Sequence, residues 1–443
     1  MTTQLQVVAN AQPQPQQPQQ PQQPQQQHQQ SDPNSKISPQ QPQQLLLLPK
    51  EHYSPIPNFH VPTTTTTESN AQHGQHLETI NQGTQQMHGL HSTKAEIYKC
   101  LPQAWLGVPP SIRKVIGWIY LVIFCSSFGF INILPAMLLC VPYTWLYFPK
   151  TSSTILTFFI ITWLLPRREW VAFRKLGQLW YEIFDFHCNL SDADREAVME
   201  TASSKQYIVC SHPHSIIPLH AVLWSAYCDQ YLPPIYGFGC SAEMAKYTPV
   251  LGNILNWLAS GSATYKALRA GLVHGYCPPA HNNGRQVHHL FILAGGVAEI
   301  FTCSMNKHVI VYRKRRGLIR LALETGACLV PSYTFGATEL FHHDSFATAT
   351  GLLGSKVSKF WRKMRVGVTF FHGQFGLPII PYTPRVTLIL GEPVVVEKYH
   401  GDPSTIPNEL IEQVHQQYLQ RFTEMFYKYR TVCGYPNAEL EIQ

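Results

Sequence analysis

Charged residues are scarce in this 443-residue chain. They make up 13% of it, whereas soluble domains average about 25%. The 11 cysteines include no Cys-x-x-Cys pair, which favours reduced, buried thiols over a disulfide framework and argues against a zinc site. No Gly-x-Ser-x-Gly sequence occurs either, which argues against a serine lipase. The formal net charge of +7 is a mild basic excess. It suits an anionic membrane surface, a nucleic acid or a phosphorylated ligand equally well.

The first 96 residues contain few large apolar side chains and consist largely of Gln-Pro repeats and a run of threonines. Segments of this composition cannot bury enough apolar surface to offset the entropy of ordering. The sequence therefore predicts a disordered cytosolic tail at residues 1–96. No basic segment followed by an apolar run, the pattern of a secretory signal, follows Met1, so membrane insertion is expected from an internal segment.

A long apolar block follows, and Lys150 is its only charged residue. Residues 115–134 would form about 30 Å of helix, which matches the apolar core of a bilayer. Pro135 and Pro142 are expected to end this helix, and residues 151–165 are expected to form a second span.

Basic residues flank this block at both ends, which places both ends on the cytosolic side by the positive-inside rule. The sequence therefore predicts a two-helix membrane hairpin at residues 110–166, in a multi-pass protein with both termini cytosolic. A buried helix pair of a soluble protein is the alternative. The flanking residues are Arg113, Lys114, Arg167, Arg168, Arg174 and Lys175.

After Trp170, short β-rich runs alternate with helical stretches. This alternation predicts an α/β fold with a mostly parallel sheet at residues 167–430, followed by a C-terminal tail at 431–443. Sheets of this kind bind ligands at the carboxyl ends of their strands. The expected strands are 207–210, 289–293, 308–312, 328–333 and 386–390, and the expected helices are 317–325, ending near Gly326, and 406–429.

The first chemical motif is His212-Pro213-His214, followed by Ser215, at the end of an expected strand. Histidine titrates near neutral pH and suits a general base acting on a hydroxyl, which acyl transfer to an alcohol requires. A loop with hydrogen-bonded structural histidines is the alternative interpretation, because the chain has 21 histidines.

The second motif, from Gly295 and Gly296 to Glu299, follows another expected strand. Two glycines allow a tight turn and a close approach of the backbone to a ligand. Glu299 is expected to orient a histidine or to bind a substrate hydroxyl. An ordinary strand-to-helix turn with a surface acid remains the alternative.

The third motif is a basic run, from Arg313 through Lys314 and Arg315 to Arg316, with Arg320 on the expected helix that follows. A helix N-terminus favours anions, and the added guanidinium groups predict a seat for the phosphates of coenzyme A. Acidic lipid headgroups and a plain solvated surface are the alternatives. Nucleic acid is disfavoured, because the basic cluster is single and the protein is expected to be membrane-embedded.

A further expected strand ends in Phe335 and Gly336, which bring another glycine turn to the same edge of the sheet. Each of these motifs is weak in isolation, and their order along the chain carries more information than any one of them.

In this order, the motifs resemble the type-2 diacylglycerol acyltransferase family, which includes monoacylglycerol and wax-alcohol acyltransferases. The resemblance runs from about residue 110 to 430, and its most specific part is the stretch from Arg315 to Gly336. It rests on the two-helix entry segment and on the motifs at His212–His214, Gly295–Glu299, Arg315–Gly336, Phe371–Gly373 and Leu390–Val396.

The resemblance implies an enzyme of the endoplasmic reticulum membrane that also reaches lipid droplets. It implies acyl-CoA as the donor and diacylglycerol as the acceptor, so that the product is triacylglycerol; no cofactor and no metal are required. His214 is the expected general base, with His212 second and Glu299 orienting the base. The other residues of the motifs, Ser215, Gly295, Gly296, Arg313, Lys314, Arg315, Arg316, Arg320, Phe335 and Gly336, are expected to bind substrate.

Three departures from the family pattern mark a divergent member. Ser215 stands where the family has glycine, Asp185 where it has the proline of Tyr-Phe-Pro, and Ala337 where it has the glutamate of Phe-Gly-Glu. Monoacylglycerol and long-chain alcohol remain alternative acceptors. A non-catalytic lipid-droplet scaffold and a lipid hydrolase remain alternative functions, and a homo-oligomer is left open.

Overall fold

The computed structural model describes residues 94–443 apart from 166–168, 203, 234–237, 276–288 and 344–370, and without the side chains of 130–139, 141 and 142. Nearly all of the predicted N-terminal tail therefore lies outside the described residues, as do Arg167 and Arg168.

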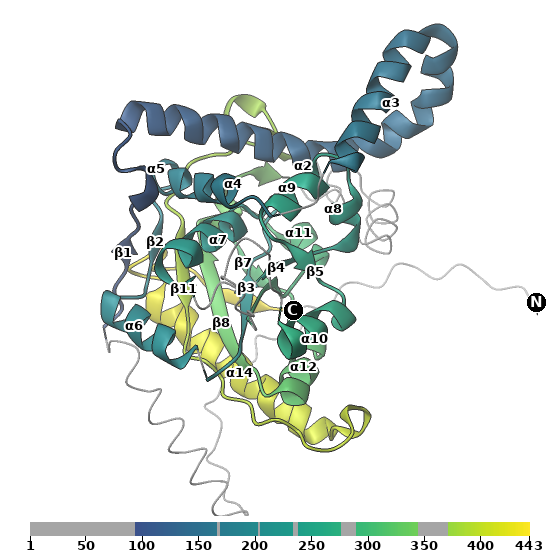
Figure 1. Ribbon diagram of the computed structural model, residues 1–443. Helices are drawn as coiled ribbons and strands as arrows, with labels where there is room; N and C mark the ends of the chain where they lie inside the picture. Colours follow the sequence, from purple (N-terminus) through teal and green to yellow (C-terminus); the bar gives the residue numbers. More distant parts are fainter. Residues whose placement is uncertain (1–93, 166–168, 203, 234–237, 276–288, 344–370) are drawn as a thin grey trace, which may run out of the picture. The chain divides into compact units, whose positions relative to one another are not determined.

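A mixed eight-stranded sheet lies at the centre of the fold (Figure 1). The strand β3 is parallel to both of its neighbours, β6 and β8, so these three strands end at the same edge of the sheet. Beyond them, β11 runs antiparallel to β8, and β4 and β5 continue the parallel part. In spatial order the strands are β1 (Tyr98–Lys99), β2 (His187–Cys188), β11 (Thr387–Leu390), β8 (Cys328–Phe335), β3 (Tyr207–His212), β6 (Leu290–Leu293), β4 (Phe238–Ser241) and β5 (Gly261–Ser262).

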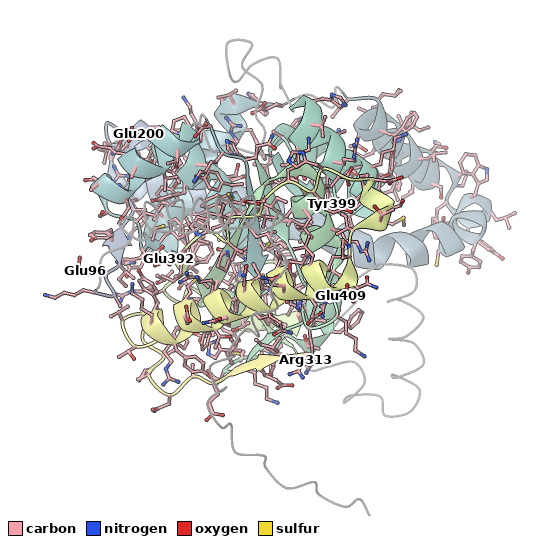
Figure 2. All side chains as sticks on the ribbon, turned by 90° about the horizontal axis from the view of Figure 1, so that it is seen from below. Glu96, Glu200, Arg313, Glu392, Tyr399 and Glu409 are labelled. Carbon is pink, nitrogen blue, oxygen red and sulfur yellow. The ribbon has the colours of Figure 1, made fainter. Side chains whose placement is uncertain are left out.

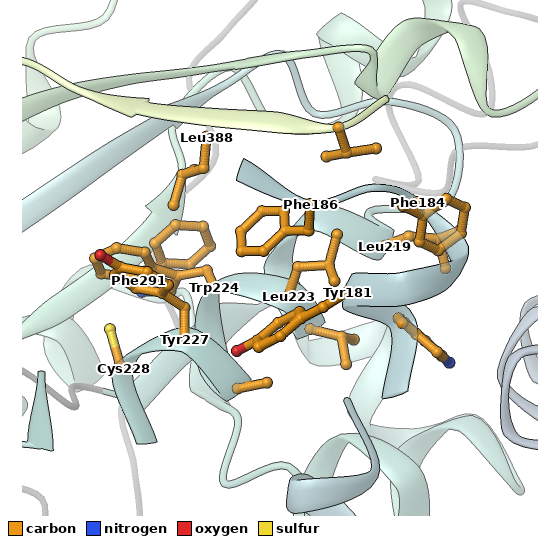
Figure 3. Close-up of a cluster of buried hydrophobic side chains, with 14 of the residues drawn as sticks. Tyr181, Phe184, Phe186, Leu219, Leu223, Trp224, Tyr227, Cys228, Phe291 and Leu388 are labelled. Carbon is orange, nitrogen blue, oxygen red and sulfur yellow. The ribbon is translucent and has the colours of Figure 1, made fainter. Parts of the chain in front are cut away.

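Helices cover both faces of this sheet, which explains why all six residues of β3 are buried. Successive side chains of a strand point to opposite faces, so Val209 joins the core beneath α7 (Leu219–Tyr231), whereas Ile208 joins the core beneath α14 (Asn408–Tyr429). Figure 3 shows the first core, in which Trp224 and Tyr227 of α7 lie beside Phe291 of β6. The predicted α/β fold is thereby confirmed.

Two helices precede the sheet's central strands. Helix α2 (Pro110–Tyr147) is continuous, so the prediction that Pro135 and Pro142 end it is wrong. A proline removes one backbone hydrogen bond and bends a helix, but it does not have to end it. Helix α3 (Pro149–Leu164) contacts α2 and returns to the domain, where the amide of Asn253 donates to the carbonyl of Thr162 at 2.8 Å.

One helix in the described part of the chain is long and apolar enough to cross a membrane, over the 20 residues Pro110–Gly129. In its 18-residue apolar window, 39% of the residues are buried in the protein. Two of the basic residues expected to mark the cytosolic flanks are buried instead. Arg113 pairs with Glu182 at 2.5 Å, and Arg174 pairs with Glu169 and with Asp229. These two guanidinium groups are therefore paired within the fold, and exposed Lys114 and Lys175 are left among the described flanking cations.

The C-terminal segment, expected to be a tail, is folded. Its strand β12 (Leu440–Ile442) pairs in parallel with β7 (His308–Ile310), which the sequence placed in the main sheet. The helix α12 (Gly317–Thr325) ends, as predicted, at Gly326, whose φ is +78°. The remaining elements are η1 (Gln103–Trp105), α4 (Val171–Lys175), η2 (Leu176–Leu179), α5 (Trp180–Ile183), α6 (Asp192–Thr201), α8 (Glu243–Tyr247), α9 (Leu251–Trp257), α10 (Tyr265–His274), α11 (Val297–Thr302), η4 (Ala337–Glu339), β9 (His342–His343), β10 (Phe371–His372), η5 (Gln374–Gly376) and η6 (Pro403–Thr405).

Candidate active site

Three loops meet at the carboxyl edge of the parallel strands. The His212-Pro213-His214 motif ends β3, the glycine turn follows β6, and Phe335 ends β8. Because β3 lies between β6 and β8 in the sheet, the first motif lies between the other two. The edge predicted from the alternation of strands and helices is therefore the one that gathers the chemical groups.

The carboxylate of Glu299 holds this arrangement together. Its Oε1 accepts from Nδ1 of His212 at 2.6 Å and from the N–H of Val311 at 2.9 Å. Its Oε2 accepts from the N–H of His214 at 2.7 Å. The side chain is only 1% exposed, and three donors supply the compensation that a buried carboxylate needs. A Cβ at Gly295 would overlap this carboxyl group, so the first glycine of the turn makes room for it.

The ring of His212 is fully buried. Because a carboxylate only accepts, Nδ1 of His212 carries the proton shared with Glu299. The rings of Tyr312 and Phe422 meet the imidazole edge-on, with centroids 5.4 and 5.3 Å away. Its Nε2 is buried without a hydrogen-bond partner among the described residues. Glu299 is thus hydrogen-bonded to the ring of His212, whereas its hydrogen bond to His214 is to the backbone N–H.

His214 is partly exposed, and its Nδ1 lies 2.9 Å from the carbonyl oxygen of Ser215. A carbonyl cannot donate, so Nδ1 carries the proton and Nε2 of the neutral ring is left as a base. Burial lowers the pKa of His214 below its ordinary value of 6.5. The ring is therefore neutral at pH 7, the state in which it can take a proton.

Ser215 has a φ of +60°, in the left-handed region where glycine is unstrained and other residues are uncommon. Its hydroxyl donates to the carbonyl oxygen of Ala337 at 2.7 Å. Two of the three departures from the family pattern are thus in direct contact. The third, Asp185, has a φ of +40° and pairs with Lys99 at 2.7 Å and with Arg385 at 2.8 Å.

The glycine turn offers one backbone donor. Gly296 has a φ of +56°, which favours glycine, and its N–H already donates to the carbonyl of Leu293 at 3.0 Å. Gly295 is buried, and its N–H has no hydrogen-bond partner in the part of the chain that the structure describes. Of the two glycines, Gly295 therefore has the amide that remains available to a ligand.

The side chains of the basic run differ in what they contact. Arg313 and Lys314 are exposed, and Arg313 donates to the carbonyl of Ile442 at 3.2 Å. Figure 2 shows Arg313 at the periphery beside the C-terminal strand. Arg315 donates to the carbonyl of Gly295 at 2.9 Å, which brings the run beside the glycine turn. Arg316 instead pairs with Glu412 of α14 at 2.7 Å. Further along, Arg320 donates to the side chain of Asn408 at 3.2 Å.

Phe335 and Gly336 serve the packing of the fold. Phe335 is 1% exposed, and its ring lies against Phe426 and Tyr435 with centroids 5.2 and 5.4 Å away. Gly336 has a φ of +83°, and a Cβ there would collide with the carbonyl of Arg385. The packing of Phe335 and the conformation of Gly336 therefore fix the end of β8 and the turn that follows it.

One buried histidine near this site was missed by the sequence reasoning. His220, at the start of α7, is 1% exposed. Burial, reinforced by nearby His214 and His212, lowers its pKa to about 3. Its only sequence signal was its place eight residues after His212 in a largely apolar stretch. Within the described ranges, no group of three or more His, Cys, Asp or Glu side chains is placed to hold a metal ion.

Comparison with known proteins identifies similar sequences in one family. A family model described as diacylglycerol acyltransferase matches residues 145–443. Human diacylglycerol O-acyltransferase 2 is 29% identical over 255 residues, which cover 54% of this chain and 60% of the human protein. The Xenopus laevis protein of the same name is 30% identical over 253 residues, which cover 53% and 64%. Human diacylglycerol O-acyltransferase 2-like protein 6 is 25% identical over 245 residues, which cover 53% and 68%.

The match spans about three fifths of the length of the first of these relatives. No solved structure matches the chain.

Proposed function

The chain belongs to the diacylglycerol acyltransferase family, and on this basis we propose that it transfers a fatty acyl group from acyl-CoA to the free hydroxyl of diacylglycerol, which yields triacylglycerol. The observation that carries the proposal is the buried carboxylate of Glu299, which holds the loop of His212 and His214 at the edge of the sheet. A neutral histidine on a fixed loop is what proton removal from a hydroxyl requires.

In this proposal His214 is the general base. Its Nε2 removes the proton from the acceptor hydroxyl while the oxygen attacks the thioester carbonyl. The carbon–sulfur bond then breaks, and the proton held by His214 passes to the departing thiolate of coenzyme A. The hydrogen bond from Nδ1 to the carbonyl of Ser215 supports this assignment, because it leaves Nε2 as the basic nitrogen.

His212 and Glu299 are positioning residues in this scheme. The Nε2 of His212 is buried, and aromatic rings lie edge-on to its imidazole, whereas His214 as a residue is only partly buried. Glu299 fixes the backbone of His214 directly and the ring of His212 beside it. The N–H of Gly295 is the proposed donor to the oxyanion that forms on the thioester carbon.

Acyl-CoA is the proposed donor substrate, and no bound cofactor enters the reaction. We assign the contact with its phosphates to Arg313, Lys314 and Arg320. Lys314 is exposed, and the other two make one neutral hydrogen bond each, both 3.2 Å long. Arg316 is excluded from this role by its ion pair with Glu412. The bond from Arg315 to Gly295 places this basic surface beside the proposed oxyanion donor.

We propose that α2 and α3 form a hairpin in the membrane of the endoplasmic reticulum, with both termini cytosolic, and that the protein also reaches lipid droplets. The outer face of α2 supports this, because side chains three or four residues apart on it are about half exposed although apolar. On α3, Phe158, Ile161, Trp163 and Leu164 are exposed as well. The partners are acyl-CoA, diacylglycerol and membrane lipids, and a homo-oligomer is compatible with the hairpin. The residues of the outer face of α2 are Ile112, Val115, Ile119 and Ile123.

The test is expression in a host that makes no triacylglycerol, followed by mass spectrometry of the neutral lipids. We expect triacylglycerol to appear, and His214→Ala to lower the rate roughly 10²–10⁴-fold. His187→Ala is the matched control, since its Nδ1 also bonds to a backbone carbonyl, at 2.7 Å, in a partly buried site. Absence of any acyl ester, with the protein present in membranes, would overturn the proposal in favour of a non-catalytic lipid-droplet scaffold.

A further inference from the structure

Beside the histidine loop, His220 is buried with both ring nitrogens unpaired. The residue is 1% exposed, and neither nitrogen has a hydrogen-bond partner in the described part of the chain. A buried polar group left without a partner costs about 1–3 kcal/mol. Native proteins keep few such groups, and each of them calls for an explanation, such as a catalytic role, local strain, or a water molecule or ion.

Four buried hydroxyl groups in the sheet share this condition, those of Ser211, Ser332, Thr334 and Thr387, and the first two are neighbours. Ser211 of β3 and Ser332 of β8 are register partners and are both fully buried. Neither Oγ has a partner among the described residues. Val209, two residues before Ser211, belongs to the core beneath α7. Since side chains alternate along a strand, both hydroxyl groups point toward the α7 face of the sheet.

The packing of α7 brings His220 to the same end and the same face of the sheet as these hydroxyl groups. Trp224 stacks on Phe291 of β6, with ring centroids 5.4 Å apart, and Figure 3 shows the two rings together. Leu293, two residues or about 6.6 Å further along the strand, is the register partner of Ser211. His220 precedes Trp224 by one helical turn, about 5.4 Å. Helix α7 connects parallel strands, so its N-terminus lies at their carboxyl edge and this turn runs toward Ser211.

We propose that His220, Ser211 and Ser332 form a buried polar subsite that binds a neutral ester or hydroxyl oxygen of the acyl acceptor, next to the hydroxyl that reacts. The inference rests on the proposed function and names the acceptor class of that same site. Each of the three groups can both donate and accept a hydrogen bond. None is charged at neutral pH, so a phosphate or carboxylate would be buried there without a counter-charge.

The subsite therefore distinguishes glycerides from simple alcohols. A diacylglycerol carries two ester groups beside its free hydroxyl, whereas a long-chain alcohol carries no other oxygen. A site with unpaired buried polar groups discriminates against a ligand that lacks the matching group, because binding that ligand leaves the polar groups unpaired. We expect the intact subsite to favour diacylglycerol. Its removal should bring kcat/KM for diacylglycerol closer to kcat/KM for a long-chain alcohol.

The test measures kcat/KM for dioleoylglycerol and for hexadecanol with oleoyl-CoA. The variants are His220→Phe, which keeps the ring volume, and the double variant Ser211→Ala with Ser332→Ala. We expect kcat/KM for dioleoylglycerol to fall roughly 10-fold or more, mainly through KM, and the value for hexadecanol to change less than about twofold. Thr387→Val is the matched control, because this hydroxyl is buried at the same edge on the opposite face of the sheet.

The subsite is overturned if kcat/KM falls equally for both acceptors. It is also overturned if kcat/KM falls for neither acceptor in variants whose melting temperature is unchanged. Binding of radiolabelled dioleoylglycerol to the purified full chain in detergent is measured in parallel. If the wild type forms no ester, the proposed function fails. The subsite is then judged from dioleoylglycerol binding alone: weaker binding by both variants supports it, and unchanged binding refutes it.

Discussion

Glu299 bonds to three donors at the centre of the site, and its replacement by glutamine tests that arrangement. An amide has one oxygen and its nitrogen only donates, so Glu299→Gln satisfies at most two of the three donors. The third N–H is left buried without an acceptor, at a cost of about 1–3 kcal/mol. The two remaining bonds lose their ionic character and about half their strength, roughly 1 kcal/mol each. An amide is easier to bury than a carboxylate, which offsets part of this loss.

We therefore expect Glu299→Gln to destabilise the fold by about 2 kcal/mol, which lowers the melting temperature by about 4 °C. The rate should fall roughly 10²-fold, because the backbone of His214 is no longer held in place. Tryptophan fluorescence on heating in detergent and acyl-CoA turnover measure the two effects. Glu392→Gln is the control, since its pair with Arg421 at 2.9 Å is partly exposed and should contribute less than about 1 kcal/mol. This account is refuted if the glutamine variant keeps at least about half of the wild-type rate and melts within about 1 °C of the wild type.

The other predictions concern the loop backbone, the basic run and acid stability. Ser215→Gly relieves a positive φ but loses a buried hydrogen bond, so we expect a net change within about 1 kcal/mol in the melting experiment. Lys314→Ala should raise KM for acyl-CoA severalfold at unchanged kcat, whereas Arg316→Ala should lower the melting temperature instead. Because the pKa of His220 falls from 6.5 to about 3 on folding, the unfolded chain binds the extra proton. His220 alone should lower stability by about 2 kcal/mol between pH 6.5 and pH 5. Burial also lowers the pKa of His214, His308 and His415, which adds to the total loss, so His220→Phe should remove only the part due to His220.

Much of the fold could be predicted from local patterns. The helix at 317–325 and its end at Gly326 follow from a short amphipathic run and a glycine that accepts a positive φ. The parallel strands follow from apolar runs separated by helical stretches. The end of α2 could not be predicted, because Pro135 lowers helix stability without forbidding a helix. The pairing of 308–310 with the C-terminal strand could not be predicted either, since pairing partners depend on distant parts of the chain.

The candidate site divides in the same way. Residue type pointed to His214, His212 and Glu299, because few other side chains move protons near neutral pH. Residue type also suggested the basic run as one phosphate seat, although Arg316 is engaged by α14. His220 could not be predicted, because nothing in the sequence around it distinguishes a buried, unpaired imidazole from a surface histidine.

The apolar block, the alternation of strands and helices, and the short motifs that end the strands can all be read from the sequence, because they depend on composition and on residues close along the chain. Three features depend on the folded chain: which ring Glu299 holds, which cations are engaged in ion pairs, and the contact of Ser215 with Ala337 across 122 positions. Each of these depends on the order of the strands in the sheet. That order brings distant strand ends to one edge, and burial there decides which polar groups find a partner.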